Sequence, residues 1–443
     1  MGSAPLHNAE LPWALIGAGP MGLAMAKNLR EQQIPFEGFE AHTDVGGLWD
    51  ISAKRSTVYK TAHLISSKTT TEFSDFPMPE DTPDYPRHDL LLQYFQRFAE
   101  HYRLREHYHF SCCVDAAEPV DNGWQVSWTD ADGQAHKKLF AGLLIANGTL
   151  AAPNKPILEG QFDGELIHAA RYKSPEQFRD KRVLVVGAGN SGCDIVVDAA
   201  NHGSKADLSV RRGYHFVPKY LFGKPADTLG GLVKLPIKLK RKVDSLLLRA
   251  FVGDPTRFGF PSPDHALYES HPIVNSLVLF HLGHGDVQVR PDIDYLEGQT
   301  VHFKDGSQDD YDVIVTATGY RLDYPFIDRE LLNWQNDAPH LYLNCFHPSR
   351  DDLFVLGMVE ASGLGWQGRH EQAELVACYI RGRQQNSATA REFASTKAGH
   401  FSDMRGGVDY LKLPRMAYYV HKDTYRKAVK QHLKAFRSEE TSA

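Results

Sequence analysis

The sequence predicts an α/β protein with two Rossmann-like dinucleotide-binding domains, the second inserted in the first. The pattern G-x-G-x-x-G occurs twice, at 17–22 and 187–192, each time between an apolar run and a helical stretch. Strand-like sequence returns late in the chain, at 302–320, and we assign it to the first domain. The expected limits are 1–160 and 291–443, with the C-terminal helices, for the first domain, and 161–290 for the second.

The first domain is expected to open with a buried strand that runs into a glycine turn, WALIGAGPMG at 13–22. Residues 41–88 are expected to be loop-rich, because the proline-dense stretch DFPMPEDTPDYPRH excludes regular structure. The other elements predicted here are a helix at 23–33, a strand at 36–40, a helix at 89–102, two strands around the Asp132–Gly133 turn, and a buried strand at 142–148.

The second domain is expected to begin after the Pro/Gly connection APNKPILEGQF at 152–162. Strand, turn and helix repeat at 181–195, and a second strand follows at 206–212. Residues 213–285 give no clear pattern except a basic stretch at 232–251, which we interpret as a surface helix interrupted at Pro236 rather than a membrane contact. The remaining elements predicted are a hairpin and buried strand at 302–320, a strand at 353–357, a helix at 368–383, and a docked C-terminal helix with Tyr425, Val429, Leu433 and Phe436 on one face.

Composition excludes several classes of function. The formal net charge of the 443 residues is −6, which does not favour nucleic-acid binding. The five cysteines form no C-x-x-C pair, so a dithiol redox centre is disfavoured, and no His/Cys spacing typical of a metal site occurs. No secretory leader and no apolar run long enough to span a bilayer are visible, so a cytoplasmic location is expected. Oligomeric state is left open, with a homodimer as one option.

The first glycine motif predicts an FAD site. Gly17 makes the tight turn, Gly19 lets the backbone approach a pyrophosphate, and Gly22 lets the helix pack on the strand. Glu40 follows Gly22 by 18 residues, at the end of the next strand, where a carboxylate binds free ribose hydroxyls. The intervening residues expected to contact the cofactor are Ala18, Pro20 and Met21.

The second glycine motif predicts an NADPH site. The strand that would end in an acid ends here in Arg211 and Arg212, and two guanidinium groups suit a 2′-phosphate rather than a bare ribose. A solvated surface pair is the alternative for these arginines. The residues expected to contact NADPH with them are Gly187, Gly189, Asn190, Ser191, Gly192 and Asp194.

Between the two motifs, Phe162-x-Gly164-x-x-x-His168-x-x-x-Tyr172 resembles the fingerprint of the flavin-containing monooxygenase family, in the class that includes Baeyer–Villiger monooxygenases. The ending in Tyr rather than Trp is similar to the N- and S-oxygenating branch. Further matches are Gly46-Gly47-Leu48-Trp49, Asp75-Phe76-Pro77 and Ala317-Thr318-Gly319-Tyr320. The resemblance implies cofactor contacts from Gly47, Leu48, Trp49, His63, Thr318 and Gly319, and a linking role between domains for His168.

The resemblance also implies a reaction. NADPH reduces FAD, the flavin takes up O2 as a hydroperoxide at its 4a carbon, and a small-molecule nucleophile, an amine nitrogen or sulfide sulfur, accepts one oxygen atom; a ketone substrate is the further option. Members of the family carry an asparagine at the position of Ile65, which cannot form hydrogen bonds, although the Ser66 hydroxyl could substitute in part. Ile65 and Ser66 are therefore the residues expected at the reaction centre. Two alternatives stay open: an NADPH oxidase or flavin reductase that releases hydrogen peroxide, and a non-catalytic NADPH sensor.

Overall fold

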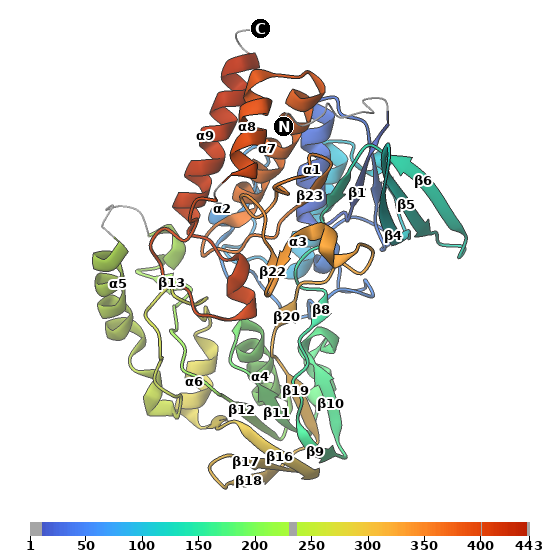
Figure 1. Cartoon of the computed structure of the whole chain (residues 1–443). Coiled ribbons are helices and arrows are strands. Elements are labelled where there is room, and N and C mark those ends of the chain that lie inside the picture. Colours follow the sequence, from blue (N-terminus) through green and yellow to red (C-terminus); the bar gives the residue numbers. More distant parts are fainter. Residues whose placement is uncertain (1–10, 230–236, 400, 441–443) are drawn as a thin grey trace.

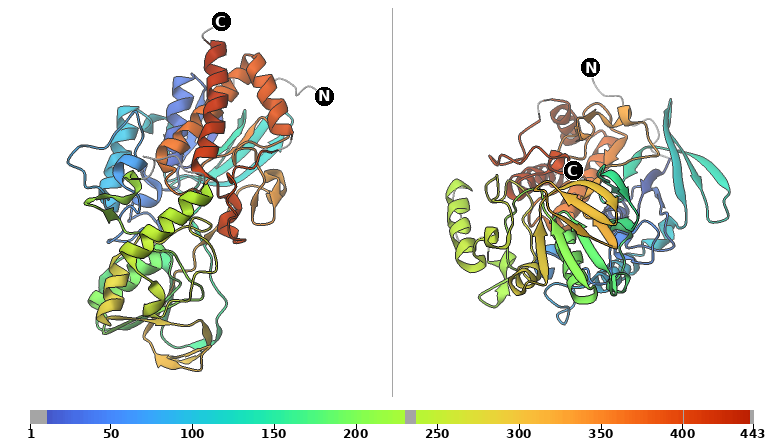
Figure 2. Two further views of the ribbon diagram at one scale, coloured as in Figure 1. Left: turned by 90° about the vertical axis from the view of Figure 1, so that its left-hand side faces the viewer. Right: turned by 90° about the horizontal axis from the view of Figure 1, so that it is seen from below.

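The computed structural model of the chain describes residues 11–229, 237–399 and 401–440 (Figure 1). It contains two parallel sheets, one in each domain, with the C-terminal helices at the end of the molecule farthest from the second domain (Figure 2). None of the helices in these ranges is long and apolar enough to cross a membrane.

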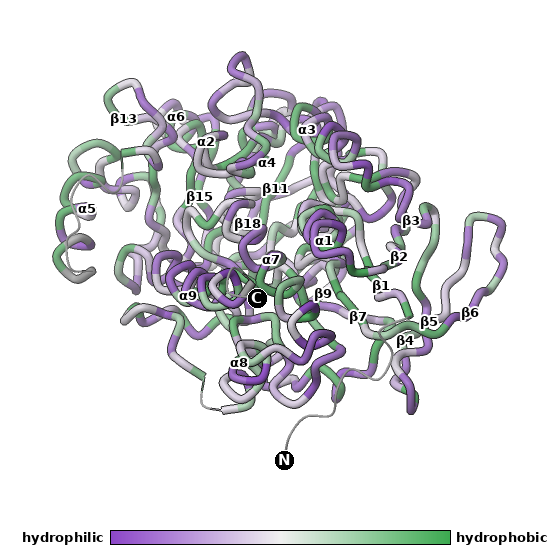
Figure 3. Tube along the Cα trace, turned by 90° about the horizontal axis from the view of Figure 1, so that it is seen from above, coloured by the Kyte–Doolittle hydropathy of each residue, from purple (hydrophilic) through white to green (hydrophobic). Residues whose placement is uncertain are grey.

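The first domain is built on a five-stranded parallel sheet, ordered β23-β7-β1-β2-β3. Its strands are β1 (Trp13–Ile16), β2 (Phe36–Phe39), β3 (Tyr108–His109), β7 (Leu143–Ile145) and β23 (Leu353–Val355). Because successive side chains of a strand point to opposite faces, Trp13 and Leu15 pack under helices, whereas Ala14 and Ile16 pack under an antiparallel sheet. That sheet, β4 (Cys113–Val120), β5 (Gly123–Thr129) and β6 (Ala135–Phe140), projects to one side in Figure 3.

The helical layer of the first domain combines segments from both ends of the chain. It contains α1 (Pro20–Glu31), α2 (Lys68–Thr71), α3 (His88–His101), α7 (Gly365–Gln384), α8 (Ala388–Ala398) and α9 (Lys422–Glu440). The apolar face predicted for α9 is confirmed, because Tyr425, Val429, Leu433 and Phe436 are all buried in the main core. The short pair β21 (Trp334–Gln335) and β22 (Ala338–Pro339) lies before β23.

The second domain has its own five-stranded parallel sheet, ordered β10-β19-β11-β12-β15. Its strands are β10 (Glu165–His168), β11 (Arg182–Val186), β12 (Lys205–Ser209), β15 (Val287–Arg290) and β19 (Val313–Thr316). Helices α4 (Asn190–His202) and α6 (Leu277–His284) lie against one face. The other face is covered by β9 (Glu159–Phe162), β16 (Ile293–Gly298), β17 (Thr300–Phe303) and β18 (Gln308–Asp310).

The assignment of 302–320 to the first domain is wrong. The strand at 313–316 pairs with β11 on one side and β10 on the other, in the middle of the second sheet, so the return to the first domain comes after β19 and not at 291. A short aliphatic run predicts a buried strand but does not identify the sheet that buries it. The two crossings between domains, β8 (Ala152–Pro153) and β20 (Tyr320–Arg321), pair with each other.

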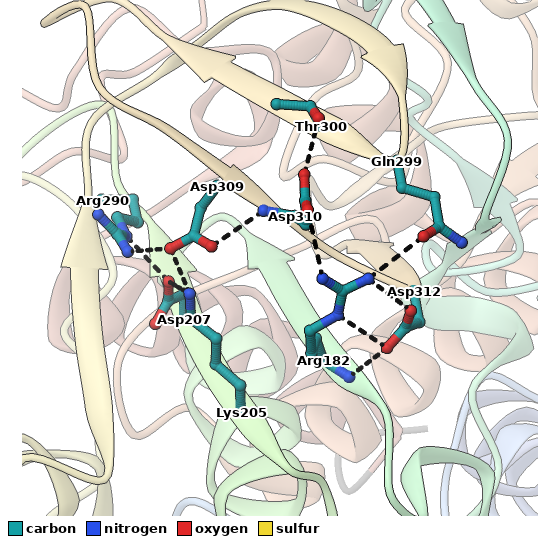
Figure 4. A network of polar contacts seen from close by, with 9 residues as sticks. All are labelled: Arg182, Lys205, Asp207, Arg290, Gln299, Thr300, Asp309, Asp310 and Asp312. Atoms are coloured by element: carbon teal, nitrogen blue, oxygen red, sulfur yellow. Dashed lines mark hydrogen bonds and ion pairs between the residues drawn. The ribbon is translucent and has the colours of Figure 1, made fainter.

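Charged residues on the second sheet are paired among themselves (Figure 4). Asp207 is 1% exposed and accepts hydrogen bonds from Arg290 Nε at 2.8 Å and from the Tyr311 hydroxyl at 2.6 Å. At the start of β11, Arg182 pairs with Asp312 at 2.9 Å. Arg290 also pairs with Asp309 of β18 at 2.6 Å, so the network connects β12 and β15 to the covering strands.

The surface helix predicted at 232–251 is present as α5 (Ile237–Val252), and residues 232–236, with Pro236, lie outside the described ranges. Several apolar side chains of α5 are exposed at the periphery of the molecule, with Leu246 at 72% (Figure 3). Two polar contacts attach α5 to the loop that contains Tyr268 and Glu269. Arg241 pairs with Glu269 at 2.7 Å, and the Tyr268 hydroxyl donates to Asp244 at 2.8 Å. The remaining strands of this region are β13 (Tyr220–Leu221) and β14 (Lys224–Pro225).

Candidate active site

The first glycine turn has the geometry that the sequence predicts. Gly17 has φ +108°, and a Cβ there would lie 2.5 Å from the Ala146 carbonyl oxygen. A Cβ on Gly22 would lie 1.9 Å from the Gly17 carbonyl oxygen, so only glycine lets α1 start this close to β1. At Gly19, in contrast, the nearest atom to a Cβ is Gly47 Cα at 3.6 Å. The backbone at Gly19 is therefore free for the approach of a pyrophosphate.

Glu40 ends β2 beside this turn and is 6% exposed. Its Oε2 accepts a hydrogen bond from the Ala18 N–H at 2.7 Å, and its Oε1 accepts one from the His42 N–H at 2.9 Å. A carboxylate has about four acceptor positions, so both oxygens can still accept from ribose hydroxyls. The residues present thus fit the adenosine half of FAD.

One cavity of about 1500 Å³ runs from Glu40 to the space between the domains, and it is larger than the ~300–1,000 Å³ of a typical small-ligand pocket. Ten residues predicted from the sequence line it: Gly17, Gly19, Pro20, Met21, Glu40, Gly47, Leu48, Trp49, Ile65 and Ser66. Of the other contacts predicted near the first turn, Ala18, Gly22 and His63 do not line it. Ala18 and Gly22 are buried behind the turn, and His63 is exposed, with Nδ1 2.7 Å from the Thr61 carbonyl oxygen.

Ile65 and Ser66 precede α2, at the junction of the two domains. The Ser66 hydroxyl lies 2.7 Å from the Thr71 hydroxyl, which itself donates to the Ser67 carbonyl oxygen at 2.8 Å. Since Thr71 has only one hydroxyl proton, Ser66 must be the donor in the first of these bonds. Ser66 can therefore accept a hydrogen bond from a ligand, but it does not replace the donor that an asparagine at position 65 would supply.

The second glycine turn repeats the backbone of the first. Gly187 has φ +102°, and a Cβ on Gly192 would lie 1.9 Å from the Gly187 carbonyl oxygen. A Cβ on Gly189 would meet no atom within 4 Å, so this turn is also open to a phosphate. Arg211 and Arg212 follow β12, and neither guanidinium forms a hydrogen bond or ion pair with a residue in the described ranges. Unpaired arginines beside an open glycine turn fit the 2′-phosphate of NADPH.

Two residues expected to contact NADPH form hydrogen bonds with other residues of the chain. The Asn190 amide accepts from the Val274 N–H at 2.7 Å and donates to the Pro272 carbonyl oxygen at 3.3 Å. Asp194 accepts from the Tyr59 hydroxyl at 2.8 Å and from the Asn275 side chain at 2.6 Å, so it links α4 to the first domain. Burial raises the pKa of Asp194 to about 6, although the Tyr59 hydrogen bond and the Lys219 charge oppose the shift.

The fingerprint residues hold the domains together. His168 Nε2 lies 3.1 Å from the Gly319 carbonyl oxygen, and its Nδ1 accepts from the Ala170 N–H, so His168 connects the end of β10 to the crossing at β20. The Tyr172 hydroxyl donates to Asp198 at 2.8 Å, one helical turn from Asp194. Thr318 also lies in the crossing, where its hydroxyl donates to the Asn154 carbonyl oxygen at 2.6 Å. Thr318 and Gly319 therefore connect the domains and do not line the cavity.

The far wall of the cavity consists of residues that the sequence did not identify. His271 Nδ1 lies 2.8 Å from the Tyr419 hydroxyl, and the Ser362 hydroxyl lies 3.2 Å from that same oxygen. Burial, and secondarily the Arg415 charge, lowers the pKa of His271 to about 3, so the imidazole is neutral at physiological pH. These residues come from three distant segments with no shared motif, and only the fold brings them together.

Comparison with known proteins places these features in a family. Residues 12–398 match the model described as FMO-like, flavin-binding monooxygenase-like. The chain is 32% identical to a probable indole-3-pyruvate monooxygenase, YUCCA9, of Arabidopsis thaliana over 70% of this chain and 75% of that protein. It is 30% identical to flavin-containing monooxygenase 1 of Homo sapiens over 79% of this chain and 70% of that protein.

Solved structures with the same fold include the OTEMO complex with FAD and NADP, at a TM-score of 0.71 and 19% identity over 98% of both chains. The open structure of cyclohexanone monooxygenase has a TM-score of 0.71 and 18% identity over 96% of this chain and 98% of that chain. Both share the arrangement of two dinucleotide-binding domains.

Proposed function

Because the chain belongs to the flavin-binding monooxygenase-like family, whose members use FAD and NADPH, we propose that it transfers one oxygen atom of O2 to a soft nucleophile, an amine nitrogen or a sulfide sulfur. The observation that carries the proposal is the single cavity that leads from the Glu40 site to a chamber between the domains. FAD bound at Glu40 would have room to extend into that chamber, and NADPH would be held by the separate turn at Gly187.

FAD supplies the redox chemistry when it is bound, because it accepts hydride from NADPH and activates O2. We assign the ribose hydroxyls of FAD to Glu40 and its pyrophosphate to the backbone at Gly19. The 2′-phosphate of NADPH is assigned to Arg211 and Arg212. The apolar side chains of Leu64, Ile65, Leu356 and Trp366 line the cavity and keep water from the reacting atoms.

One feature favours nitrogen or sulfur over a ketone as the substrate atom. Tyr172 gives the fingerprint the ending that resembles the N- and S-oxygenating branch. Its hydroxyl donates to Asp198, which also accepts a hydrogen bond from Thr61 of the first domain, so the tyrosine is part of the contact between the domains. Baeyer–Villiger oxidation of a ketone is the alternative within the same family.

A second candidate function is that of an NADPH oxidase that releases hydrogen peroxide. The observation that favours it is that Ile65 cannot donate a hydrogen bond and that the neighbouring Ser66 already donates its proton to Thr71. Preorganised donors at a developing negative charge are worth ~2.7–4 kcal/mol each. Without one, part of the NADPH consumed is expected to yield peroxide instead of oxygenated product.

The test is a product balance on the purified yellow protein. NADPH oxidation, O2 uptake and peroxide release are followed with methyl phenyl sulfide, trimethylamine and cyclohexanone as probes. Sulfoxide or N-oxide formed in proportion to NADPH supports the proposed function. Peroxide equal to NADPH with every probe assigns the oxidase function, and lactone as the main product assigns the Baeyer–Villiger reaction. A protein that binds NADPH but never oxidises it would contradict all three.

A further inference from the structure

The part of the cavity wall formed by residues 360–363 and 419–423 contains a lysine that has no ion-pair partner in the described ranges. Three lysine or arginine side chains line the cavity: Arg55, Arg369 and Lys422. Arg55 contacts Cys113 Sγ at 3.4 Å, and Arg369 donates to two backbone carbonyl oxygens at 3.0 Å. Within the described ranges, the Lys422 ammonium forms neither a hydrogen bond nor an ion pair. Its Nζ lies beside Gly363, 3.7 Å from where a Cβ of that residue would be.

The position of Lys422 is not explained by the stability of its helix. It is the first residue of α9, and a positive charge at a helix N-terminus is unfavourable by a few tenths of a kcal/mol up to ~1 kcal/mol. The neighbouring Asp423 is exposed and does not approach it within the 4.0 Å of an ion pair. A partly buried ammonium without a partner loses hydration and gains nothing in return. A ligand that supplies a negative charge would remove this cost.

Other hydrogen-bond donors lie in the same wall. Ser362 precedes Gly363, and its hydroxyl, together with Tyr419 and His271, forms the chain of contacts across the two domains. The Tyr410 hydroxyl also lines the cavity and has no hydrogen-bond partner in the described ranges. Two carboxylates of the described residues lie in this part of the wall: Glu360, which is 3.6 Å from Arg369 and is therefore paired, and the exposed Asp423. The Lys422 ammonium and the Tyr410 hydroxyl have no partner in the described ranges, so both can donate to an anionic ligand.

We propose that this wall is a subsite for a carboxylate group of the substrate, with Lys422 as its ion-pair partner and the Ser362 and Tyr410 hydroxyls as further donors. This inference rests on the proposed function, because it concerns the molecule that receives the oxygen atom. It narrows the substrate class to sulfides or amines that also carry a carboxylate. The carboxylate fixes one end of the molecule, and the nucleophilic atom at the other end faces the flavin part of the cavity.

Two probes that differ in one group test the proposal. 3-(Methylthio)propionate carries a carboxylate, and 3-(methylthio)propan-1-ol has the same sulfide and chain length without the charge. In both reactions NADPH, a proton and O2 give NADP+ and water, and the second oxygen atom of O2 goes to sulfur. A charge-assisted contact is worth ~1.5–3 kcal/mol, so kcat/KM for the acid is expected to exceed that for the alcohol by about 10- to 100-fold.

Variants then assign the preference to Lys422. In Lys422→Met the acid-to-alcohol ratio of kcat/KM is expected to fall by about 10- to 100-fold, whereas Lys422→Arg, which keeps the charge, should retain most of it. Lys427→Met is the matched control, because Lys427 is an exposed lysine on the same helix. Flavin content and the rate of anaerobic flavin reduction by NADPH are measured for each variant, so that a folding defect is recognised.

Several outcomes would overturn the proposal. The first is equal kcat/KM for the acid and the alcohol in the parent enzyme. The second is an equal fall of kcat/KM for both probes in Lys422→Met, which would place the ammonium against the flavin instead. If Lys422→Met does not fold, titration of the oxidised parent holoenzyme with each probe, followed by the flavin spectrum, decides between tight binding of the acid and no difference. Failure of the proposed function is distinguishable, because then neither probe yields a sulfoxide.

Discussion

The two glycine turns share one backbone geometry and differ in the surfaces onto which they open. Gly17 and Gly187 have φ angles of +108° and +102°. In each motif, a Cβ added to the third glycine would lie 1.9 Å from the carbonyl oxygen of the first glycine. The first turn opens into the large cavity, beside a buried carboxylate. The second lies outside that cavity, and its strand is followed by two arginines that have no ion-pair partner among the residues that the structure describes.

This difference shows where the choice of nucleotide is encoded. The turn itself supplies N–H groups and a helix N-terminus, which suit the pyrophosphate of any dinucleotide. The residue after the next strand decides which ribose is accepted, and the walls decide how long the nucleotide stays. A buried carboxylate within an enclosed cavity suits a cofactor that remains bound, whereas exposed arginines suit one that enters and leaves in each cycle.

The largest expected effect on nucleotide binding comes from placing a bulky side chain in one glycine turn or the other. Gly19→Leu is expected to yield a colourless protein without FAD, because its side chain would fill the space of the pyrophosphate while the protein has room for it. Gly189→Leu is the matched change, and it should keep FAD but lose flavin reduction by NADPH. The measurements are the flavin absorbance per chain and anaerobic reduction rates. Full flavin occupancy in Gly19→Leu would mean that FAD does not bind at this turn.

The next effect concerns the two arginines. Arg211→Ala or Arg212→Ala removes one charge-assisted phosphate contact, worth ~1.5–3 kcal/mol, so the KM for NADPH should rise by about 10- to 100-fold. The KM for NADH should change little, because NADH has no 2′-phosphate. The control is Arg257→Ala, an arginine in the same domain outside the glycine turn. An equal rise for both nucleotides would assign the arginines to a structural role.

The same comparison shows what the sequence could predict. The motifs, Glu40 and the two arginines follow a local code, because a strand, a turn and a helix are set by neighbouring residues, and the structure confirms their geometry. The sheet that receives residues 313–316 and the partner of Asp194 depend on contacts between distant segments. His271, Tyr419 and Lys422 were missed for the same reason, since each belongs to a segment whose own pattern carries no sign of a site.

Substitution of Ile65 tests the reaction end of the first site and should have a smaller effect. Ile65→Asn supplies the donor that Ser66 does not, so the peroxide released per NADPH is expected to fall several-fold, within the range that one preorganised donor of ~2.7–4 kcal/mol allows. Peroxide and NADPH are measured together, with and without methyl phenyl sulfide. Ile65→Val, which keeps the apolar surface, is the control. If the parent enzyme releases no peroxide and Ile65→Asn releases more, another group already supplies the donor.

The smallest effect is expected at Asp194, where the second domain meets the first. Its pKa is raised to about 6 by burial, from an ordinary value of about 3.9. Below pH 4 the group is protonated in the folded and the unfolded chain alike, so its ionisation has no influence on stability. As the pH rises from about 4 to 6, the unfolded chain releases this proton before the folded chain does, and the folded state loses up to about 3 kcal/mol of stability, a loss that is complete above pH 6.

Asp194→Asn should remove that pH dependence. The amide can still accept from the Tyr59 hydroxyl, but its NH2 group would face the Asn275 amide, which donates to Asp194 in the parent, so one hydrogen bond of about 1 kcal/mol is lost. The variant is therefore expected to melt slightly below the parent at pH 4.5 and at or above it at pH 8. Melting of the holoenzyme, followed by flavin fluorescence across this pH range, measures the difference.

Asp81→Asn, at an exposed position, controls for the loss of a formal charge. A melting difference that is constant with pH would show that Asp194 is ionised throughout the range and that Tyr59, Asn275 and Lys219 together compensate for its burial.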